Sequence, residues 1–388
     1  MEEGESVYVT QIKMGIDNQL IRSWHRMNKD KLYEIIIAMV PIKSDEKKDY
    51  RGIVSHNLKD YYSSIKQLDV DERPDHWNEV QKRLKQLIDG INRAIESEYK
   101  GTRHSAFASI KNQLDGYQTQ KTKIEGLTLN ETIYSISKGT VAYKMRKVSL
   151  KEQRKLKRED MFHIPLDKRG LVETQRYSVP GYPCIYLAHR IYGCWEEMGR
   201  PDFGTVMVSK FETQKEFKLL DLRIPSKEMW KKDMVRCILI FPLVIASMVQ
   251  VKNSKDTYKP EYLIPQLLTE WVISKNRDGK DDEKILGIIY TSAQKNDDFD
   301  FPEDSYNNYA IPVLNPLGSN KYCKRLKDYF KLTAPTYYDL EVLKRVDGLP
   351  CGQLGLSEEE QKEENMMLSH FGKMEEFLQD AELNYVIG

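Results

Sequence analysis

Residues 161–199, MFHIPLDKRGLVETQRYSVPGYPCIYLAHRIYGCWEEMG, carry more information than any other segment of this chain. Arg169 and Arg176 precede a Pro-Gly turn, the apolar run Cys184–Ala188 follows it, and the acidic pair Glu196-Glu197 comes last. A guanidinium is a permanent cation with a geometry suited to phosphate, and a downstream carboxylate can act on a sugar or a developing cation. The order of basic segment, short strand and acid therefore predicts a nucleotide-handling site.

Short β-prone runs continue on both sides of this segment, between about residues 138 and 315, with helical patterns between them. The β-prone runs lie at 141–143, 184–188, 205–211, 217–222 and 285–292, and the helical patterns at 191–198, 229–249 and 265–274. Their spacing is irregular and shows no strand–helix repeat. The pattern therefore favours an α+β domain over 138–315 rather than a doubly wound parallel sheet.

Residues 1–135, by contrast, are predicted to form a helical domain. A four-residue step links Ile12, Ile16, Leu20 and Trp24. The segment 76–94 has one apolar stripe opposite a charged face, as expected of an amphipathic helix. This stripe consists of Val80, Leu84, Leu87, Ile88 and Ile91. The polar run 117–123 is the expected boundary of the domain.

Residues 316–388 return to a helical pattern and are predicted to form a C-terminal extension. Ser357-Glu-Glu-Glu360 is a capping box, which typically opens a helix. The apolar stripe after it consists of Met366, Met367, Phe371, Met374 and Phe377. A stripe of this kind is more typical of packing on the body of the protein than of a cofactor or partner groove.

The composition limits the class of protein. The 388 residues are enough for two domains, and 60 basic against 59 acidic residues give a net charge of +1. This balance makes nucleic acid an unlikely partner. Five scattered cysteines without Cys-x-x-Cys spacing indicate free thiols in a reducing compartment. The most apolar segment, 237–249, is shorter than the roughly 20 residues of a membrane span. Without a signal-peptide pattern, a cytoplasmic protein with no membrane segment is expected.

Familiar catalytic motifs are missing: the sequence has no Walker A, dinucleotide, zinc-protease or serine-hydrolase signature, and its seven histidines are too dispersed to predict a metal site. Two Arg-x4-His pairs, Arg51 with His56 and Arg158 with His163, match a pattern found in helical RNA-cleaving domains. About one such pair is expected by chance in a chain of this composition. The two pairs therefore carry little weight, and RNA cleavage is kept only as an alternative.

Seven motifs in a fixed order between Thr140 and Val313 resemble the RES domain, a family named for its Arg, Glu and Ser. They are Ala142-Tyr-Lys-Met-Arg146, Thr174-Gln-Arg-Tyr-Ser-Val-Pro-Gly181, Cys184-Ile-Tyr-Leu-Ala188, Cys194-Trp-Glu-Glu197, Glu261-Tyr-Leu-Ile-Pro-Gln266, Leu286-Gly-Ile-Ile-Tyr-Thr-Ser-Ala293 and Asn307-Asn-Tyr-Ala310. Bacterial members are toxins that degrade NAD. The helical N-terminal part looks like the HEPN-type extension that accompanies some RES domains. The resemblance implies an α+β core like that of ADP-ribosyltransferases, with NAD in a cleft.

The resemblance also implies site residues. Arg176 matches the family arginine before the turn, Tyr186 the strand tyrosine ten residues later, and Glu197 the family glutamate 11 residues further on. Ser292 matches the family serine, although some members place that serine nearer the segment where this chain has Leu263 and Ile264.

The first motif departs from the family pattern, because Tyr143-Lys144 stands where members often have Tyr-Arg, with Arg146 two residues on. Lysine keeps the charge but lacks the bidentate fork, so its hold on a phosphate is looser. Arg176 and Arg146 are expected to hold the pyrophosphate of NAD, and Tyr143 or Tyr186 to stack on a ring or pack.

The implied reaction is cleavage of the nicotinamide–ribose bond, with Glu197 stabilising an oxocarbenium-like state and Ser292 donating a hydrogen bond. NAD is then the substrate, and no metal or added cofactor is expected. With water as the acceptor the protein is expected to be an NAD glycohydrolase, and with phosphate an NAD phosphorylase. In either case a toxin or an anti-phage defence effector is expected. ADP-ribose transfer to a macromolecule is one alternative, and an RNA-cleaving or RNA-binding protein with an inert RES domain is another. The further candidate partners are an antitoxin or regulatory protein and a second copy of the chain.

Overall fold

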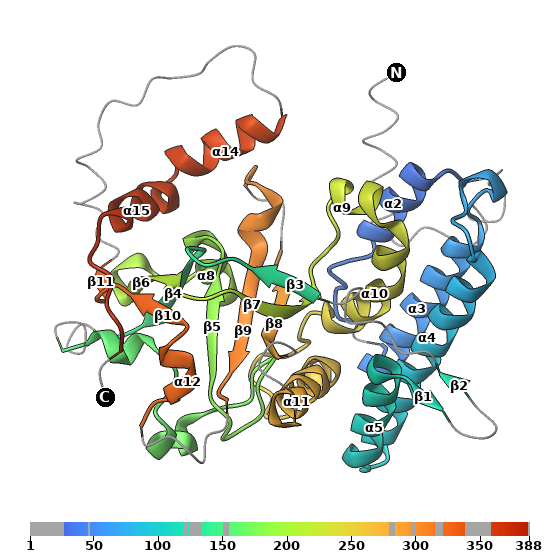
Figure 1. The fold of residues 1–388 in the computed structure, drawn as a ribbon, viewed down its shortest axis with the longest axis horizontal. Helices are drawn as coiled ribbons and strands as arrows, with labels where there is room; N and C mark the ends of the chain where they lie inside the picture. Colours follow the sequence, from blue (N-terminus) through green and yellow to red (C-terminus); the bar gives the residue numbers. More distant parts are fainter. Residues whose placement is uncertain are drawn as a thin grey trace. The chain divides into compact units, whose positions relative to one another are not determined.

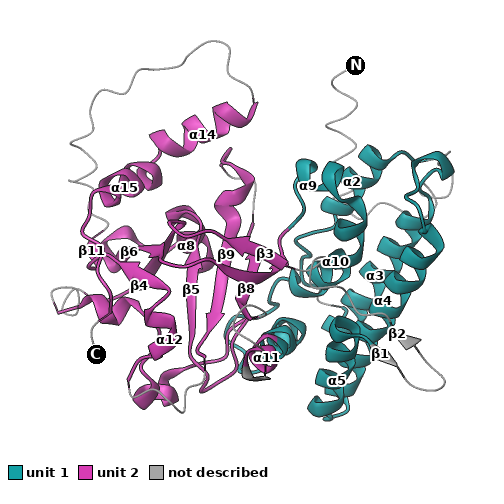
Figure 2. Cartoon of the chain, in the orientation of Figure 1, with its two compact units in different colours: residues 1–132, 224–271 teal, residues 133–223, 272–388 magenta. Residues whose placement is uncertain are grey.

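The computed structural model describes residues 27–45, 47–118, 123–124, 133–149, 155–278, 284–295, 299–314, 321–337 and 358–386. The predicted helical step between Ile12 and Trp24 lies outside these residues. The chain forms two compact units (Figure 2): unit 1 combines Met1–Thr132 with Ile224–Trp271, and unit 2 combines Ile133–Arg223 with Val272–Gly388. Helices dominate unit 1 and a mixed sheet dominates unit 2, which confirms the α+β prediction.

Unit 1 consists mainly of helices (Figure 1). The predicted stripe from Val80 to Ile91 is buried along the longest of them, because its spacing keeps these side chains on one face. The helices are α2 (Lys29–Ile37), α3 (Tyr50–Lys66), α4 (Trp77–Tyr99), α5 (Arg103–Asp115), α9 (Lys227–Lys232) and α10 (Met234–Ser247), followed by the first part of α11 (Leu263–Asp278). Two short strands, β1 (Tyr117–Gln118) and β2 (Lys123–Ile124), pair antiparallel.

The central helix of unit 1 is α10, which is apolar all round and buried from Cys237 to Ser247. The predicted helix 229–249 is two helices, because Asp233 breaks it and its side chain accepts a hydrogen bond from the backbone N–H of Arg236 (3.0 Å). Pro242 lacks an N–H and leaves the carbonyl of Ile238 without its helical donor. The hydroxyl of Tyr61 on α3 donates to that carbonyl at 2.8 Å.

Segment 224–271 therefore belongs with the N-terminal helices, although the sequence placed it inside the domain 138–315. The hydroxyl of Tyr33 donates to the carbonyl of Pro225 (3.1 Å), and that of Tyr50 to the carbonyl of Ala246 (2.8 Å). Such long-range contacts carry no local sequence signal.

None of the helices in the described part of the chain combines the length and the apolar character that a membrane span requires.

Unit 2 contains a sheet of nine strands in the order β10-β6-β4-β5-β9-β8-β7-β3, with β11 also paired to β6. Neighbours are antiparallel except β7 and β8, which are parallel. The strands are β3 (Ile133–Ile136), β4 (Val141–Lys147), β5 (Cys184–Ala188), β6 (Val206–Thr213), β7 (Phe217–Leu222), β8 (Ile285–Thr291), β9 (Asn307–Pro312), β10 (Phe330–Leu332) and β11 (Thr336–Tyr337). The five predicted β-prone runs all lie in this sheet.

Alternation along the strands divides the side chains between two faces. On one face, which we call the inner face, Ile185, Leu187 and Phe211 pack with the segment around Met161. On the other, the helix face, Tyr143, Ala188 and Val208 pack against α8 (Ile191–Glu197) and α15 (His370–Gln379). Adjacent strand residues therefore reach different surroundings.

The predicted C-terminal extension is part of unit 2 rather than an appendage. Residues 321–337 form α12 (Lys324–Lys327) and the strands β10 and β11. The apolar stripe continues over two helices, α14 (Glu358–Leu368) and α15, and the turn between them rotates it. Met366, Phe371 and Met374 are buried in the helix-face core, whereas Met367 and Phe377 are exposed. Packing on the body is confirmed for the three buried side chains only.

Candidate active site

Helix α8 carries the predicted acid and lies directly after strand β5. Its first turn lies close to the sheet at Gly193, where a Cβ atom would lie 2.7 Å from the carbonyl of Ser305 and 3.2 Å from Cβ of Ala188. Glycine is thus required at this position by the close approach of α8 to the strands. Glu197 follows four residues later and so lies on the same side of the helix.

The carboxyl group of Glu197 is surrounded by polar groups of unit 2 while its side chain stays exposed to solvent. Nδ2 of Asn308 on β9 donates to Oε1 of Glu197 at 3.1 Å. Desolvation by the protein raises the pKa of Glu197, whereas hydrogen bonds from Ser292 and Asn308 and the positive charge of Arg176 oppose that rise. The predicted residues Arg176, Glu197 and Ser292 therefore lie together.

Arg176 lies in a tight turn that is tied to strand β5. Gln175 and Ser178 exchange both backbone hydrogen bonds, at 3.1 and 3.2 Å, which leaves Arg176 and Tyr177 at the tip. The hydroxyl of Tyr186 accepts from the backbone N–H of Tyr177 and donates to Oγ of Ser178, each at 3.2 Å. Burial raises the pKa of Tyr186 well above its usual value, so this hydroxyl stays protonated. Tyr186 thus holds the arginine turn in place.

Two further residues, Asn308 and Tyr290, join the site; both lie in the RES-like motifs, but the sequence analysis gave neither of them a role. Asn308 is buried and contacts Glu197. The ring of Tyr290 on β8 packs against Tyr177 with ring centroids 4.3 Å apart, and its pKa is raised by burial and then by the charge of Glu197. The signal for Asn308 and Tyr290 is a polar or amphipathic side chain within an otherwise apolar strand, on the face shared with Tyr186.

Lys144 and Arg146, which the sequence analysis assigned to NAD, are not brought to this site. Both lie on the inner face of β4, opposite the helix face. The Lys144 ammonium donates to the carbonyl of Phe162, and Nη1 of Arg146 donates to the carbonyl of Asp160 at 2.8 Å. Burial, followed by repulsion from Arg146, lowers the pKa of Lys144 to about 8. We therefore remove both residues from the candidate site.

Tyr143 does lie on the helix face, but beside a different group of charges. It is buried, and its carbonyl accepts a hydrogen bond from the thiol of Cys194. Burial, and then the negative charge of Glu375, raises the pKa of Tyr143. Its surroundings are those of a core residue under α8 and α15. The predicted contact of Tyr143 with a ligand has no support in this geometry.

Two neighbours of the site residues have structural contacts instead. Glu196 is buried and forms an ion pair with Arg200, with Oε1 and Nη2 3.0 Å apart. Nε of Arg169 donates to the carbonyl of Gly181 at 2.6 Å and so supports the Pro-Gly turn. These contacts give Glu196 and Arg169 structural roles in unit 2.

Arg51 and both histidines of the two Arg-x4-His pairs have acid or backbone partners. On α3, Arg51 lies 3.2 Å from Glu96, and Nε2 of His56 lies 3.4 Å from Asp60. His163 is buried, and Nε2 accepts from the backbone N–H of Cys323 at 2.8 Å while Nδ1 donates to the carbonyl of Ile164 at 2.7 Å. Burial lowers the pKa of His163 to about 4, which keeps its ring neutral. His163 is a structural residue.

The site thus combines a carboxylate, two neutral donors and a guanidinium on one side of the sheet. Such a set can stabilise developing positive charge and orient a polar, anionic ligand without a histidine base. No group of three His, Cys, Asp or Glu side chains within the described residues is arranged to hold a metal ion. The four cysteines in the described ranges, Cys184, Cys194, Cys237 and Cys323, are free thiols.

Comparison with known proteins adds one relative. Over 272 residues the chain is 31% identical to a protein of Bacillus subtilis (strain 168) named "Putative toxin YopC". The match covers 66% of this chain and 59% of that protein, so the chain spans less than two thirds of its relative's length. No model of a known protein family matches the chain. No solved structure matches it.

Proposed function

We propose that this protein is an enzyme that consumes NAD by cleaving the nicotinamide–ribose bond, and that it acts as a toxin. The observation that carries the proposal is the convergence of Arg176, Glu197 and Ser292, which come from three separate segments of the chain. Tyr186 holds the turn that bears Arg176. These four residues are the ones that the resemblance matches to the arginine, the strand tyrosine, the glutamate and the serine of RES domains.

The geometry suggests a role for each group. In the proposed reaction Glu197 stabilises the oxocarbenium-like state at C1′ and accepts a hydrogen bond from the 2′-hydroxyl of the ribose. Arg176 lies near enough to lower the pKa of Glu197, so it both favours the carboxylate and offers a cation for the pyrophosphate. Ser292 and Asn308 orient the carboxylate through hydrogen bonds. Proton transfer by a histidine is unnecessary, because the cationic nicotinamide is already a good leaving group.

The name of the Bacillus subtilis relative supports a toxin role for this chain. Depletion of NAD would explain toxicity inside a bacterial cell, and it would equally serve an anti-phage effector. Expression of the wild-type chain in a bacterial host is expected to stop growth and lower cellular NAD, whereas a Glu197→Gln variant should do neither. Growth arrest with unchanged cellular NAD would contradict the proposed reaction.

The reaction and its acceptor are tested by incubating the purified full chain with NAD labelled in the adenine. ADP-ribose as the soluble product indicates hydrolysis, and ADP-ribose 1-phosphate formed only with added phosphate indicates a phosphorylase. Label on protein or nucleic acid indicates transfer of ADP-ribose. If NAD is unchanged after hours at micromolar enzyme, with and without phosphate, the proposed function is wrong.

The RNA alternative makes an opposite prediction for the same chain. If the helical unit were an RNA-cleaving domain, His56→Ala would abolish toxicity and Glu197→Gln would leave it. We expect the reverse, because the His56 ring and the Arg51 guanidinium each contact a carboxylate on the surface of unit 1. Growth curves for the two variants, expressed at equal levels, distinguish the alternatives.

The pH dependence of turnover follows from the environment of Glu197. Desolvation by the surrounding protein raises the pKa of this carboxyl, so activity should fall with acidification at a pH above the usual titration range of a glutamate. Ser292→Ala removes a hydrogen bond that lowers this pKa, and the acidic limb of kcat/KM should therefore move to still higher pH. Thr291→Val is the control, because the Thr291 hydroxyl contacts Asn307 instead. An identical acidic limb for wild type and Ser292→Ala would contradict this assignment.

A further inference from the structure

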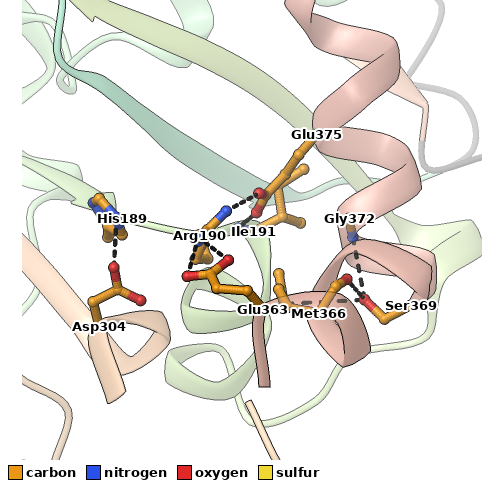
Figure 3. Close-up of polar contacts among 9 residues, drawn as sticks. All are labelled: His189, Arg190, Ile191, Asp304, Glu363, Met366, Ser369, Gly372 and Glu375. Atoms are coloured by element: carbon orange, nitrogen blue, oxygen red, sulfur yellow. Dashed lines mark hydrogen bonds and ion pairs between the residues drawn. The ribbon is translucent and has the colours of Figure 1, made fainter. Parts of the chain in front are cut away.

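Helix α8 begins without a cap of its own. Arg190 occupies the N-cap position and supplies no side-chain oxygen to the first turn. The backbone N–H of Ile191 donates instead to Oε1 of Glu375, at 2.7 Å (Figure 3). Glu375 lies on α15, 184 residues further along the chain, and only 6% of its surface is exposed. A carboxylate at this end of a helix also interacts favourably with the helix dipole.

Arg190 completes the same connection from the other direction. Its Nη1 lies 3.3 Å from Oε2 of Glu375, and its Nη2 donates to both carboxylate oxygens of Glu363 on α14, at 3.0 and 2.8 Å (Figure 3). The neighbouring His189 contacts Asp304 at 3.1 Å between Nε2 and Oδ2. The junction between β5 and α8 is therefore held by both C-terminal helices.

The helix that supplies Glu375 is itself firmly held. Ser369 caps α15 by accepting from the backbone N–H of Gly372 (3.2 Å). At the other end, Nζ of Lys210 on β6 donates to the carbonyl of Gln379 at 2.6 Å. Apolar packing adds to these contacts, since Met374 and Phe371 belong to the same buried cluster as Ile191 and Tyr192 of α8. Glu375 thus acts from a rigid support.

A helix as short as α8, of seven residues, is not stable by itself, so its position depends on its tertiary contacts. Glu197 is its last residue, about 9 Å along the axis from Ile191. A change at the first turn therefore alters where the Glu197 carboxylate lies relative to Asn308 and Ser292. Misplacement of a catalytic group by about 1 Å can lower a rate about 100-fold.

We propose that Glu375 is a positioning residue: through Ile191 and Arg190 it clamps α8 and places the carboxylate of Glu197. The C-terminal helices α14 and α15 then support the site by holding α8, without contacting the substrate. The inference rests on the proposed function insofar as NAD turnover is its readout. It adds that a residue outside the seven RES-like motifs controls the rate.

The test compares Glu375→Ala, Glu375→Gln and the control Glu376→Ala in the full chain. Glu376 is exposed on the same helix. Glu375→Ala should lower the kcat for NAD about 10- to 100-fold with KM nearly unchanged. Glu375→Gln keeps an oxygen for the N–H of Ile191 and should restore much of kcat, while Glu376→Ala should match wild type. Hydrogen exchange of residues 191–197 should be faster in Glu375→Ala than in wild type.

A lower thermal stability of Glu375→Ala with unchanged kcat would overturn the proposal, because the residue would then be structural only. Unchanged exchange of residues 191–197 would overturn it as well. If the wild type does not turn over NAD, the proposed function fails separately. The clamp is then decided by exchange alone: faster exchange of α8 in Glu375→Ala supports it, and equal exchange rejects it.

Discussion

Replacing Glu197 with glutamine should lower the kcat for NAD cleavage about 100- to 1,000-fold, because the charge that stabilises the oxocarbenium-like state is lost. The amide is nearly isosteric and still offers an oxygen to Nδ2 of Asn308, which lies 3.1 Å from the carboxylate. The fold should therefore be retained, with a melting temperature close to that of wild type. Steady-state kinetics with quantified nicotinamide release, together with a thermal unfolding curve, measure both effects.

Glu196 provides the matched control for this substitution, since it is the adjacent acid on the same helix. Its carboxylate is buried and paired with Arg200. Glu196→Gln should lower the free energy of unfolding by about 1.5–3 kcal/mol and leave the kcat of the folded enzyme unchanged. If Glu196→Gln abolished turnover and Glu197→Gln did not, the assignment of the catalytic acid would be wrong.

Arg176→Ala should lower kcat/KM for NAD about 100-fold, the kinetic equivalent of about 3 kcal/mol. Two effects add. The pyrophosphate loses a charged donor, which raises KM. Glu197 also loses the positive charge that lowers its pKa, so the acidic limb of the pH profile should move to higher pH. Kinetics over a range of pH values separate the two contributions.

Arg169→Ala is the control for Arg176→Ala, because both guanidinium groups precede the same Pro-Gly turn. Arg169 is exposed and donates to the carbonyl of Gly181. Its loss should change kcat/KM less than about threefold, the scale of a single exposed contact. Equal losses for the two variants would mean that Arg176 acts through the turn rather than on the substrate.

Much of the secondary structure could be predicted from local pattern. The strands at 184–188 and 217–222 and the apolar stripe of α4 follow from side-chain periodicity, which is a property of neighbouring residues. The spacing of Arg176, Tyr186 and Glu197 also follows from a local design. A two-residue turn, a strand and a short helix bring these residues to one side of the sheet.

The wrong assignments concern features that only the packing of the folded chain decides. Tyr143 and Lys144 are adjacent in sequence, yet strand alternation places them on opposite faces, and only the packed sheet shows which face contains the site. The helix α10 was assigned to the central domain by its place in the sequence. Its entirely apolar surface is buried in unit 1, where tyrosines of α3 reach its free carbonyls.

The sequence by itself therefore determined the α+β class and the strand–helix segment around residues 184–197, because each depends on residues close together in the chain. The choice of Arg176 and Glu197 came from the resemblance to RES domains. Only the tertiary structure decided that Ser292 and Asn308 join Glu197, that Lys144 and Arg146 do not, and that Glu375 caps α8. The contacts of Asn308 with Glu197 and of Glu375 with Ile191 link residues 111 and 184 positions apart, and such contacts arise from burial and hydrogen bonding in the folded core rather than from local propensity.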